Sequence, residues 1–342
     1  MDRIAPRLRI LTWHVHGNYL YYLTQTPHDF YLPVGRREHG YSGRAAGFPW
    51  PDNVHEVPVE QVRDLDLDCI LFQSAPHYLT DQYEMLSETQ RRLPRVYLEH
   101  DPPQQHPTNT RHIVDDPEAL LVHVTPFNEL MWDNGRTPTC VIEHGVLVPD
   151  DVRYTGELNK GLVVVNGIQR RGRRLGWDVF ERARREVPLD LIGMESASSG
   201  GVGEISHEDL PRFMCRYRFV FNPIRYTSLG LAICEAMSLG IPILGLATTE
   251  MVTAVTNNVN GYVDTNINVL IQRMRQLLAH PQDAHRLSEH AREIGRARFG
   301  IGRFAAEWDR TLRDAVRQRA DRLSAQWKPE ETAVATAAGE LR

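Results

Sequence analysis

Two loops in the second half of the sequence combine residue types that bind phosphate and sugar groups. The first loop, Asn166–Arg174, follows the apolar segment Leu162–Gly167 and leads into a helical pattern. Guanidinium groups bind phosphate oxygens in pairs, and a strand-to-helix turn adds free backbone N–H groups. The pattern predicts a pyrophosphate site, and a solvated basic loop or a nucleic-acid patch is the alternative. The candidate residues are Gly167, Arg170, Arg171, Arg173 and Arg174.

The second loop follows Asn222 and leads into a helix that carries Glu235. Gly230 lets a ligand approach the backbone closely, and Thr227 or Ser228 can cap the helix. A carboxylate such as Glu235 can accept hydrogen bonds from both vicinal hydroxyls of a ribose. On spacing alone, a capped, buried helix with one glutamate satisfied by a partner explains the same residues.

Short apolar runs alternate with helical patterns along the sequence, and they indicate the strands and helices that must position these loops. This alternation is typical of parallel sheets with helices on both faces. We predict strands at Leu8–Trp13, Cys69–Gln73, Arg95–Glu99, Leu120–Thr125, Thr139–Glu143, Leu162–Gly167, Leu189–Ile192, Phe219–Asn222 and Ile241–Leu246. We predict helices at Gly17–Gln25, Tyr78–Arg92, Phe127–Asn134, Arg173–Glu186, Leu229–Leu239 and Ile267–Ala279, and from Pro281 to Gln326.

The predicted fold class is therefore α/β, with two domains that face a cleft. We place the first domain at 1–150, the second at 151–302, a terminal helix at 303–327 and a flexible tail at 328–342. The segment Asp29–Asn53 is predicted to be a long irregular loop after a brief strand. Its aromatic residues could stack on sugar rings or pack on one another; they are Tyr31, Tyr41, Phe48 and Trp50.

Composition narrows the classes of protein to consider. The chain has 342 residues, 42% of them hydrophobic and 24% charged, with a net charge of −5. These are ordinary globular values, and the acidic balance disfavours a dedicated nucleic-acid binder. Only Lys160 and Lys328 are lysines, so 37 of the 39 basic residues are arginines. A cation needed for chemistry is therefore expected to be an arginine.

The cysteines and apolar segments indicate a cytoplasmic protein. Cys69, Cys140, Cys215 and Cys234 are widely spaced, which predicts neither a zinc site nor a disulfide framework. The segment Met1–Pro6 lacks the apolar stretch of a signal peptide. No apolar run approaches the roughly 20 residues that cross a membrane.

The second half resembles the donor site of group 1 retaining glycosyltransferases of the GT-B fold. The family pattern has a first Glu, then a second Glu after seven intervening residues, followed by Ala-Met and Gly-x-Pro. Here Glu235-Ala236-Met237 and Gly240-Ile241-Pro242 are in register, and Thr249–Val252 and Asn260–Val263 extend the likeness. In the first half, Val141–Val146 and Tyr97–Asp101 resemble an interdomain segment and a His-containing strand end of the family.

The resemblance implies a metal-independent enzyme that moves a sugar from a nucleotide diphosphate donor, UDP or GDP type, to an acceptor. Glu235 would hold the ribose, and Ser228, Leu229 and Gly230 would face the diphosphate or sugar. The arginine loop would neutralise the leaving pyrophosphate, with no enzyme nucleophile and no cofactor. His100 would lie near the reacting sugar, and the acceptor would face His16 and Gly17.

The sequence departs from the family pattern at two places. Thr227 stands where the family has its first Glu, and Leu175 stands where it has a phosphate-binding Lys. Arg173 or Arg174 would have to replace that lysine. These departures leave the donor sugar open, and they keep a non-catalytic nucleotide-sugar binding protein and a nucleotide-sugar 2-epimerase as alternatives.

Three further patterns have competing explanations. The Asp-x-Asp pattern in Asp64–Asp68 precedes a strand, so a turn is favoured over a metal site. Residues of metal-binding types are more frequent in the first half than chance suggests, and they could converge at strand ends to bind a metal ion. Their spacing fits no zinc pattern. They are His14, His16, His100, Asp101, His106 and His112. The stripe Phe304, Trp308, Leu312 and Val316 predicts docking on a core, with contact to a membrane surface as the alternative.

Overall fold

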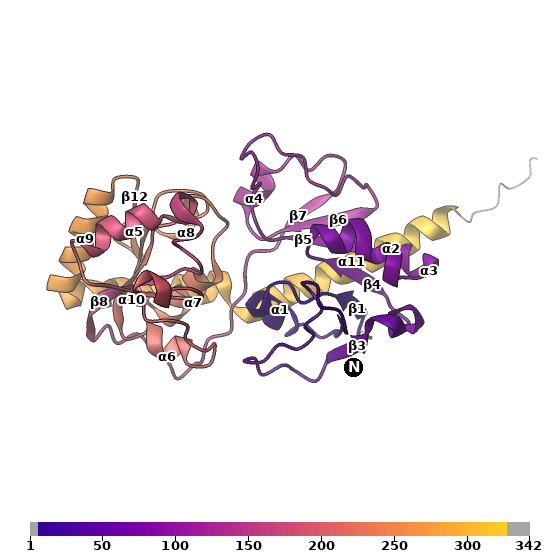
Figure 1. Cartoon of the computed structure of the whole chain (residues 1–342), viewed down its shortest axis with the longest axis horizontal. Coiled ribbons are helices and arrows are strands. Elements are labelled where there is room, and N and C mark those ends of the chain that lie inside the picture. Colours follow the sequence, from indigo (N-terminus) through magenta and orange to yellow (C-terminus); the bar gives the residue numbers. More distant parts are fainter. Residues whose placement is uncertain (1–5, 327–342) are drawn as a thin grey trace, which may run out of the picture.

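Two parallel sheets, each flanked by helices, organise the chain (Figure 1). The computed structural model describes residues 6–326, with side chains through residue 321. The first sheet has the strand order β3-β2-β1-β4-β5-β6-β7, and the second has the order β12-β11-β10-β8-β9. All named strand pairs are parallel. The predicted α/β fold class with two domains is confirmed.

The first domain holds the seven-stranded sheet and four short α-helices. Its strands are β1 (Arg9–Thr12), β2 (Asp29–Val34), β3 (Val54–Pro58), β4 (Cys69–Phe72), β5 (Arg95–Glu99), β6 (Ala119–His123) and β7 (Thr139–Val141). Its helices are α1 (Gly17–Leu23), α2 (Gln82–Met85), α3 (Glu88–Arg91) and α4 (Pro126–Met131), with a 3-10 helix at Val59–Asp64 and a π-helix at His77–Asp81. All four residues of β4 are buried, as expected for a strand covered on both faces.

The second domain holds the five-stranded sheet. Its strands are β8 (Leu158–Val164), β9 (Leu189–Ile192), β10 (Tyr217–Asn222), β11 (Ile243–Leu246) and β12 (Gly261–Asp264). Its helices are α5 (Trp177–Arg184), α6 (Leu210–Met214), α7 (Leu231–Leu239), α8 (Met251–Ala254), α9 (Ile267–Ala279) and α10 (Pro281–Phe299), with 3-10 helices at Gly172–Leu175 and Ala197–Ser199. The six residues of β10 are all buried, so this strand lies in the core.

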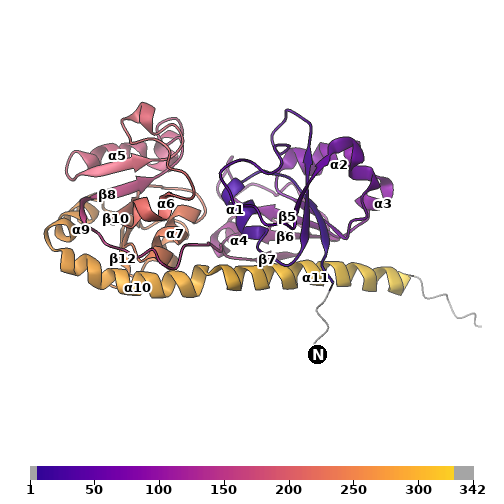
Figure 2. The same cartoon turned by 90° about the horizontal axis from the view of Figure 1, so that it is seen from below.

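The last helix, α11 (Ile301–Gln326), returns to the first domain. Figure 2 shows α10 and α11 running one after the other beneath both domains. Phe304, Trp308 and Leu312 are fully buried, and the Trp308 indole donates to the Tyr19 hydroxyl over 3.1 Å. These three residues of the predicted stripe lie in the core, and Val316 packs against it partly buried. Residue 327 and the predicted tail 328–342 lie outside the described residues.

Predicted and observed elements differ at several places. Asp29–Val34 is a strand within the predicted loop Asp29–Asn53, and it pairs with β1 and with the unpredicted β3. Pro33 weakens the strand signal there. The predicted helix Tyr78–Arg92 is broken into the π-helix, α2 and α3, because Ser87 begins a new helix with a capping box. β12 is a short strand that the sequence pattern did not predict.

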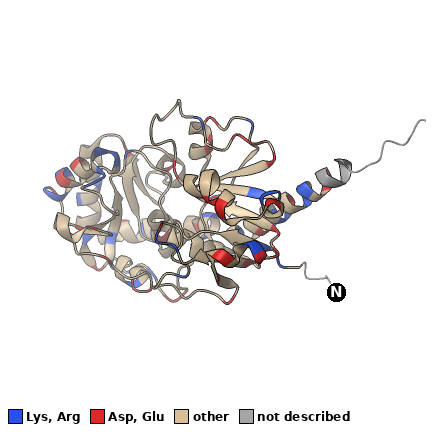
Figure 3. Ribbon diagram, turned by 45° about the vertical axis from the view of Figure 1, so that its right-hand side comes forward, with Lys and Arg blue, Asp and Glu red and all other residues tan. Residues whose placement is uncertain are grey.

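Charged residues are interspersed over both domains (Figure 3). The segment Asp64–Asp68, predicted to be a turn, instead continues from the end of the 3-10 helix at Asp64 as an irregular segment. It places Asp66 and Asp68 against Arg9, with a 3.1 Å ion pair from Arg9 to Asp68. No helix among residues 6–326 combines the length and apolarity that a membrane span requires.

Candidate functional site

A cavity of about 690 Å³ lies between the two domains. The first domain contributes residues 15–19, at the start of α1, and residues 46–48 of the long loop. The second domain contributes the ends of β8 and β9, the segment 204–207 and the start of α7. The cavity therefore lies at the carboxyl ends of parallel strands, where open α/β sheets bind ligands.

The cavity brings together six of the residues predicted from sequence. Its wall includes His16, Gly17, Arg171, Thr227, Gly230 and Glu235. A Cβ atom added to Gly230 would meet no other atom within 4 Å, so the backbone at the start of α7 is open to a ligand. The remaining predicted residues do not line this cavity; they are Gly167, Arg170, Arg173, Arg174, Ser228, Leu229 and His100.

The arginines of the predicted phosphate loop point in different directions. Arg170 forms an ion pair with Glu195 at 3.0 Å, and the two residues line a separate small cavity with Gly167. Arg173 is exposed and forms an ion pair with Asp178 at 2.7 Å. Arg171 reaches the cavity between the domains. Of these three guanidinium groups, the one on Arg171 is therefore placed to meet a ligand there.

Asp101 of the first domain faces the arginine loop across the cleft. Burial raises the pKa of Asp101, and the positive charges of Arg171 and Arg174 oppose that shift. The interaction places the Arg174 guanidinium near the cleft as well, although its side chain does not line the cavity. An anion that bound here would meet two guanidinium groups and would have to share them with Asp101.

Glu235 is a buried carboxylate at the floor of the cavity. It lies in the middle of α7 and is 5% exposed, and the Tyr22 hydroxyl of α1 donates to Glu235 Oε1 over 2.7 Å. Burial raises the pKa of Glu235, while hydrogen bonds from Tyr22 and Asn18 lower it. The sequence prediction of a partner-satisfied glutamate therefore describes the structure without ligand, and the same carboxylate opens onto the cavity.

His100 packs within a group of rings behind the cavity. Its ring centroid lies 4.2 Å from that of His16 and 4.8 Å from that of Tyr19, and its Nε2 lies 3.1 Å from Gln73 Oε1. Burial lowers the pKa of His100 well below its ordinary value, and the neighbouring His16 and His144 add to the effect. Burial likewise lowers the pKa of His16 to about 4. Both imidazoles are neutral at physiological pH.

The other histidines of the dense set are separated. His14 contacts the carbonyl of Gly43, and His112 lies 3.1 Å from Glu99, while His106 is exposed in a loop. Among residues 6–326, no three His, Cys, Asp or Glu side chains are placed to hold a metal ion.

Sequence reasoning missed three features of this site. Asn18 and Tyr22 bind Glu235 from the opposite domain, and spacing alone gave no sign of that contact. The segment 204–207 and the turn at Met194 complete the cavity wall. Ser228 and Leu229 do not line the cavity, and the backbone of Leu229 instead forms a hydrogen bond with the buried His144.

Comparison with known families decides how this site is classified. Residues 200–294 match the family model of glycosyl transferases group 1, a range that runs from before α6 into α10. This part of the second domain is therefore similar to group 1 glycosyltransferases. The matched range includes the cavity residues Thr227, Gly230 and Glu235. A search of curated protein sequences found no match.

Solved structures with the same fold cover nearly the whole chain. Sucrose-phosphate synthase from Thermosynechococcus elongatus has a TM-score of 0.62 at 16% identity, covering 94% of this chain and 100% of that protein. Anabaena HepE in complex with UDP and glucose has a TM-score of 0.61 at 13% identity, covering 90% and 99%. AviGT4, a glycosyltransferase of avilamycin A biosynthesis, has a TM-score of 0.58 at 14% identity, covering 91% and 98%. These likenesses confirm the GT-B fold, and together with the group 1 match they support a role in glycosyl transfer.

Proposed function

We propose that the chain binds a nucleoside diphosphate sugar in the cavity between its domains and transfers the sugar to a hydroxyl acceptor. The observation that carries the proposal is the shared cavity: Glu235, Arg171 and the open backbone at Gly230 all line it. A carboxylate can accept from ribose hydroxyls, a guanidinium can bind phosphate, and an open glycine leaves room for a sugar. These three functions match the three parts of such a donor.

The proposed reaction retains the anomeric configuration and needs no metal ion. The bond between the anomeric carbon and the diphosphate oxygen breaks while the acceptor oxygen bonds to the same face of the sugar, and the acceptor's hydroxyl proton passes to the departing diphosphate. Negative charge therefore grows on the diphosphate as it leaves. Arg171 and Arg174 would stabilise that charge in a partly desolvated cleft, where electrostatic interactions are stronger than in water. His16 and His100 are neutral and would act by shape and hydrogen bonding.

The donor is proposed to be of the UDP or GDP type, and the acceptor a glycan or small molecule that enters beside His16 and Gly17. The four cysteines, Cys69, Cys140, Cys215 and Cys234, are unpaired. Free thiols suit a reducing compartment, so we propose that the reaction takes place in the cytoplasm.

Calorimetric titration with UDP, GDP and ADP, in buffer that contains a chelator, tests the donor site first. Saturable binding of one nucleotide without metal is the expected result and identifies the base. Glu235→Ala should weaken that binding at least about tenfold, because it removes the ribose acceptor. Unchanged affinity in this variant would remove Glu235 from the site.

Product analysis then separates transfer from its alternatives. Incubation of the donor sugar with and without a panel of glycan acceptors should give a glycosylated product with retained configuration, read from the anomeric NMR signal. Interconversion of the free donor would indicate a 2-epimerase, which the group 1 family match does not favour. Tight binding with neither transfer nor donor hydrolysis would indicate a non-catalytic binding protein.

A further inference from the structure

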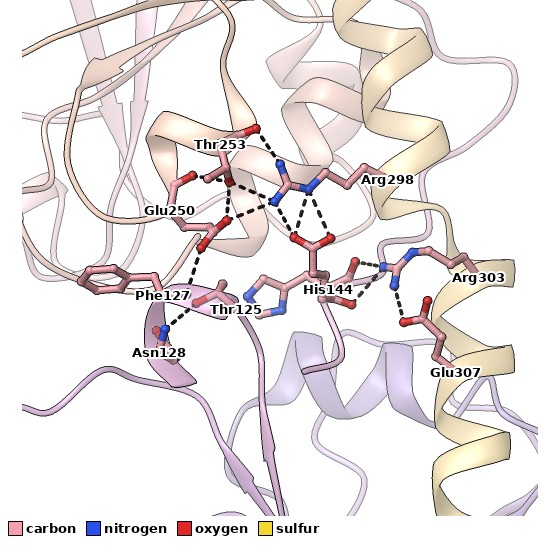
Figure 4. Close-up of polar contacts among 10 residues, drawn as sticks. Thr125, Phe127, Asn128, His144, Glu250, Thr253, Arg298, Arg303 and Glu307 are labelled. Carbon is pink, nitrogen blue, oxygen red and sulfur yellow. Dashed lines mark hydrogen bonds and ion pairs between the residues drawn. The ribbon is translucent and has the colours of Figure 1, made fainter. Parts of the chain in front are cut away.

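A buried carboxylate outside the cavity joins the two domains. Glu250 immediately precedes α8 of the second domain, and its side chain is 2% exposed. Its Oε2 accepts the backbone N–H of Phe127, at the start of α4 in the first domain, over 3.2 Å. Figure 4 shows this contact together with the groups that hold the other carboxylate oxygen.

The second oxygen of Glu250 is anchored where the chain passes between the domains. Arg298, near the end of α10, donates to Glu250 Oε1 over 3.1 Å and to Glu143, just after β7, over 3.0 Å. The Thr253 hydroxyl also donates to Glu250 Oε1 (Figure 4). Glu143 begins the link into the second domain, and Arg298 precedes the return of α11. Glu250 therefore connects this junction to the start of α4.

Helix α4 in turn holds the backbone of His100, which packs behind the cavity, and of Asp101, which faces Arg171 and Arg174. The Asn128 amide donates to the carbonyl of His100 over 3.1 Å, and the Trp132 indole donates to the carbonyl of Asp101 over 2.9 Å. Asn128 is fully buried and Thr125 caps the helix, so α4 moves with these contacts as a unit. A displacement of α4 is thus transmitted to His100 and Asp101.

We propose that Glu250 is a positioning residue, which couples the arrangement of the two domains to the placement of His100 and Asp101 through α4. A carboxylate suits this position because the first N–H groups of a helix have no partner within the helix. When the domains close on a ligand, Glu250 draws the start of α4 toward the second domain and fixes His100 and Asp101 opposite Arg171 and Arg174. When they open, that restraint is lost.

Four variants separate this role from that of an ordinary ion pair. Glu250→Ala removes the acceptor for Phe127. Glu250→Gln keeps an acceptor oxygen for that N–H without the charge. Thr253→Val, the matched control, removes a donor to Glu250 Oε1 and leaves the oxygen that binds α4. Glu250→Asp, which withdraws the carboxylate from α4, gives the same comparison should the alanine variant not fold.

The first readout is the indole ¹H–¹⁵N NMR signal of Trp132, assigned with Trp132→Phe. We expect this signal to shift in Glu250→Ala, and to stay in place in Glu250→Gln and Thr253→Val. A signal that stays in place in Glu250→Ala or Glu250→Asp, with only a lower melting temperature, would overturn the proposal. This arm needs no substrate, so it gives an answer even if the proposed glycosyl transfer fails.

The second readout rests on the proposed function. Glu250→Ala should lower kcat for sugar transfer about tenfold while the Kd for the nucleotide stays within about twofold, because the lost contact positions groups without touching the donor. Glu250→Gln should recover most of kcat. A loss of nucleotide affinity equal to the loss of kcat would contradict the positioning role.

Discussion

Neighbouring arginines of one loop give the sharpest test of the site at the scale of single residues. Arg171 lines the cavity, whereas Arg170 is held by Glu195 outside it. We expect Arg171→Gln to weaken binding of a nucleoside diphosphate about tenfold and to reduce the salt dependence of binding. Arg170→Gln, the matched control, should bind within about twofold of the wild type in calorimetry. If both variants lost the same amount of nucleotide affinity, Arg170 would also belong to the donor site.

Glu235 should strengthen nucleotide binding while its buried charge lowers the stability of the folded protein. Burial raises its pKa above the ordinary 4.5, so its charge destabilises the folded state at neutral pH. We expect Glu235→Gln to raise the free energy of unfolding at pH 7.5 by about 1 kcal/mol, with nucleotide binding weakened. The gain should shrink as pH falls through the raised pKa and vanish below 4.5, because the wild-type carboxyl is then neutral in both states. Denaturant unfolding at several pH values measures this; a lower stability of the variant at pH 7.5 would contradict it.

At the scale of elements, α11 acts as a structural part of the first domain. Trp308 is fully buried and its indole donates to Tyr19. Trp308→Ala should lower the free energy of unfolding by about 3–5 kcal/mol, and Trp308→Phe by much less, because it keeps most of the buried area. Arg317 on the same helix has a 70% exposed side chain, so Arg317→Ala should cost under about 0.5 kcal/mol. Chemical denaturation of the three variants gives the comparison.

Some helices and strands could be predicted from the sequence and others could not. Strands β5 and β9 and helix α9 were predicted with their observed bounds. Both strands are short apolar-rich segments, and α9 has a clear 3.6-residue period. β2 was missed since Pro33 interrupts its pattern. The cavity residues Thr227, Gly230 and Glu235 were reached through their position at a strand-to-helix turn. The contacts that Tyr22, Asn18 and Glu250 make across the domains were not predicted, because no local rule pairs residues of different domains.

At the scale of the whole molecule, buried histidines make stability sensitive to acid. Burial lowers the pKa of both His28 and His144 to about 4 from the ordinary 6.5. Both are neutral in the folded state, so stability is greatest above pH 6.5 and falls as pH drops toward 4, by up to about 1.4 kcal/mol per pH unit for each group. Glu235 acts in the opposite direction and offsets part of this loss.

Unfolding in guanidinium chloride at pH 7.5, 6.5 and 5.5 measures how the free energy of unfolding changes with pH. His144→Asn removes one of the groups and should flatten the dependence relative to the wild type. A stability that stays constant across this range would show that these histidines are not buried in their neutral form.

The return of α11 also affects how the protein is made. The core of the first domain includes Phe304, Trp308 and Leu312, which are translated after the entire second domain. On the ribosome, the second domain can therefore complete its own sheet and helices while the first waits with part of its apolar surface uncovered. Of the two domains, the one that is translated first finishes folding last, and chaperones have that interval in which to bind it.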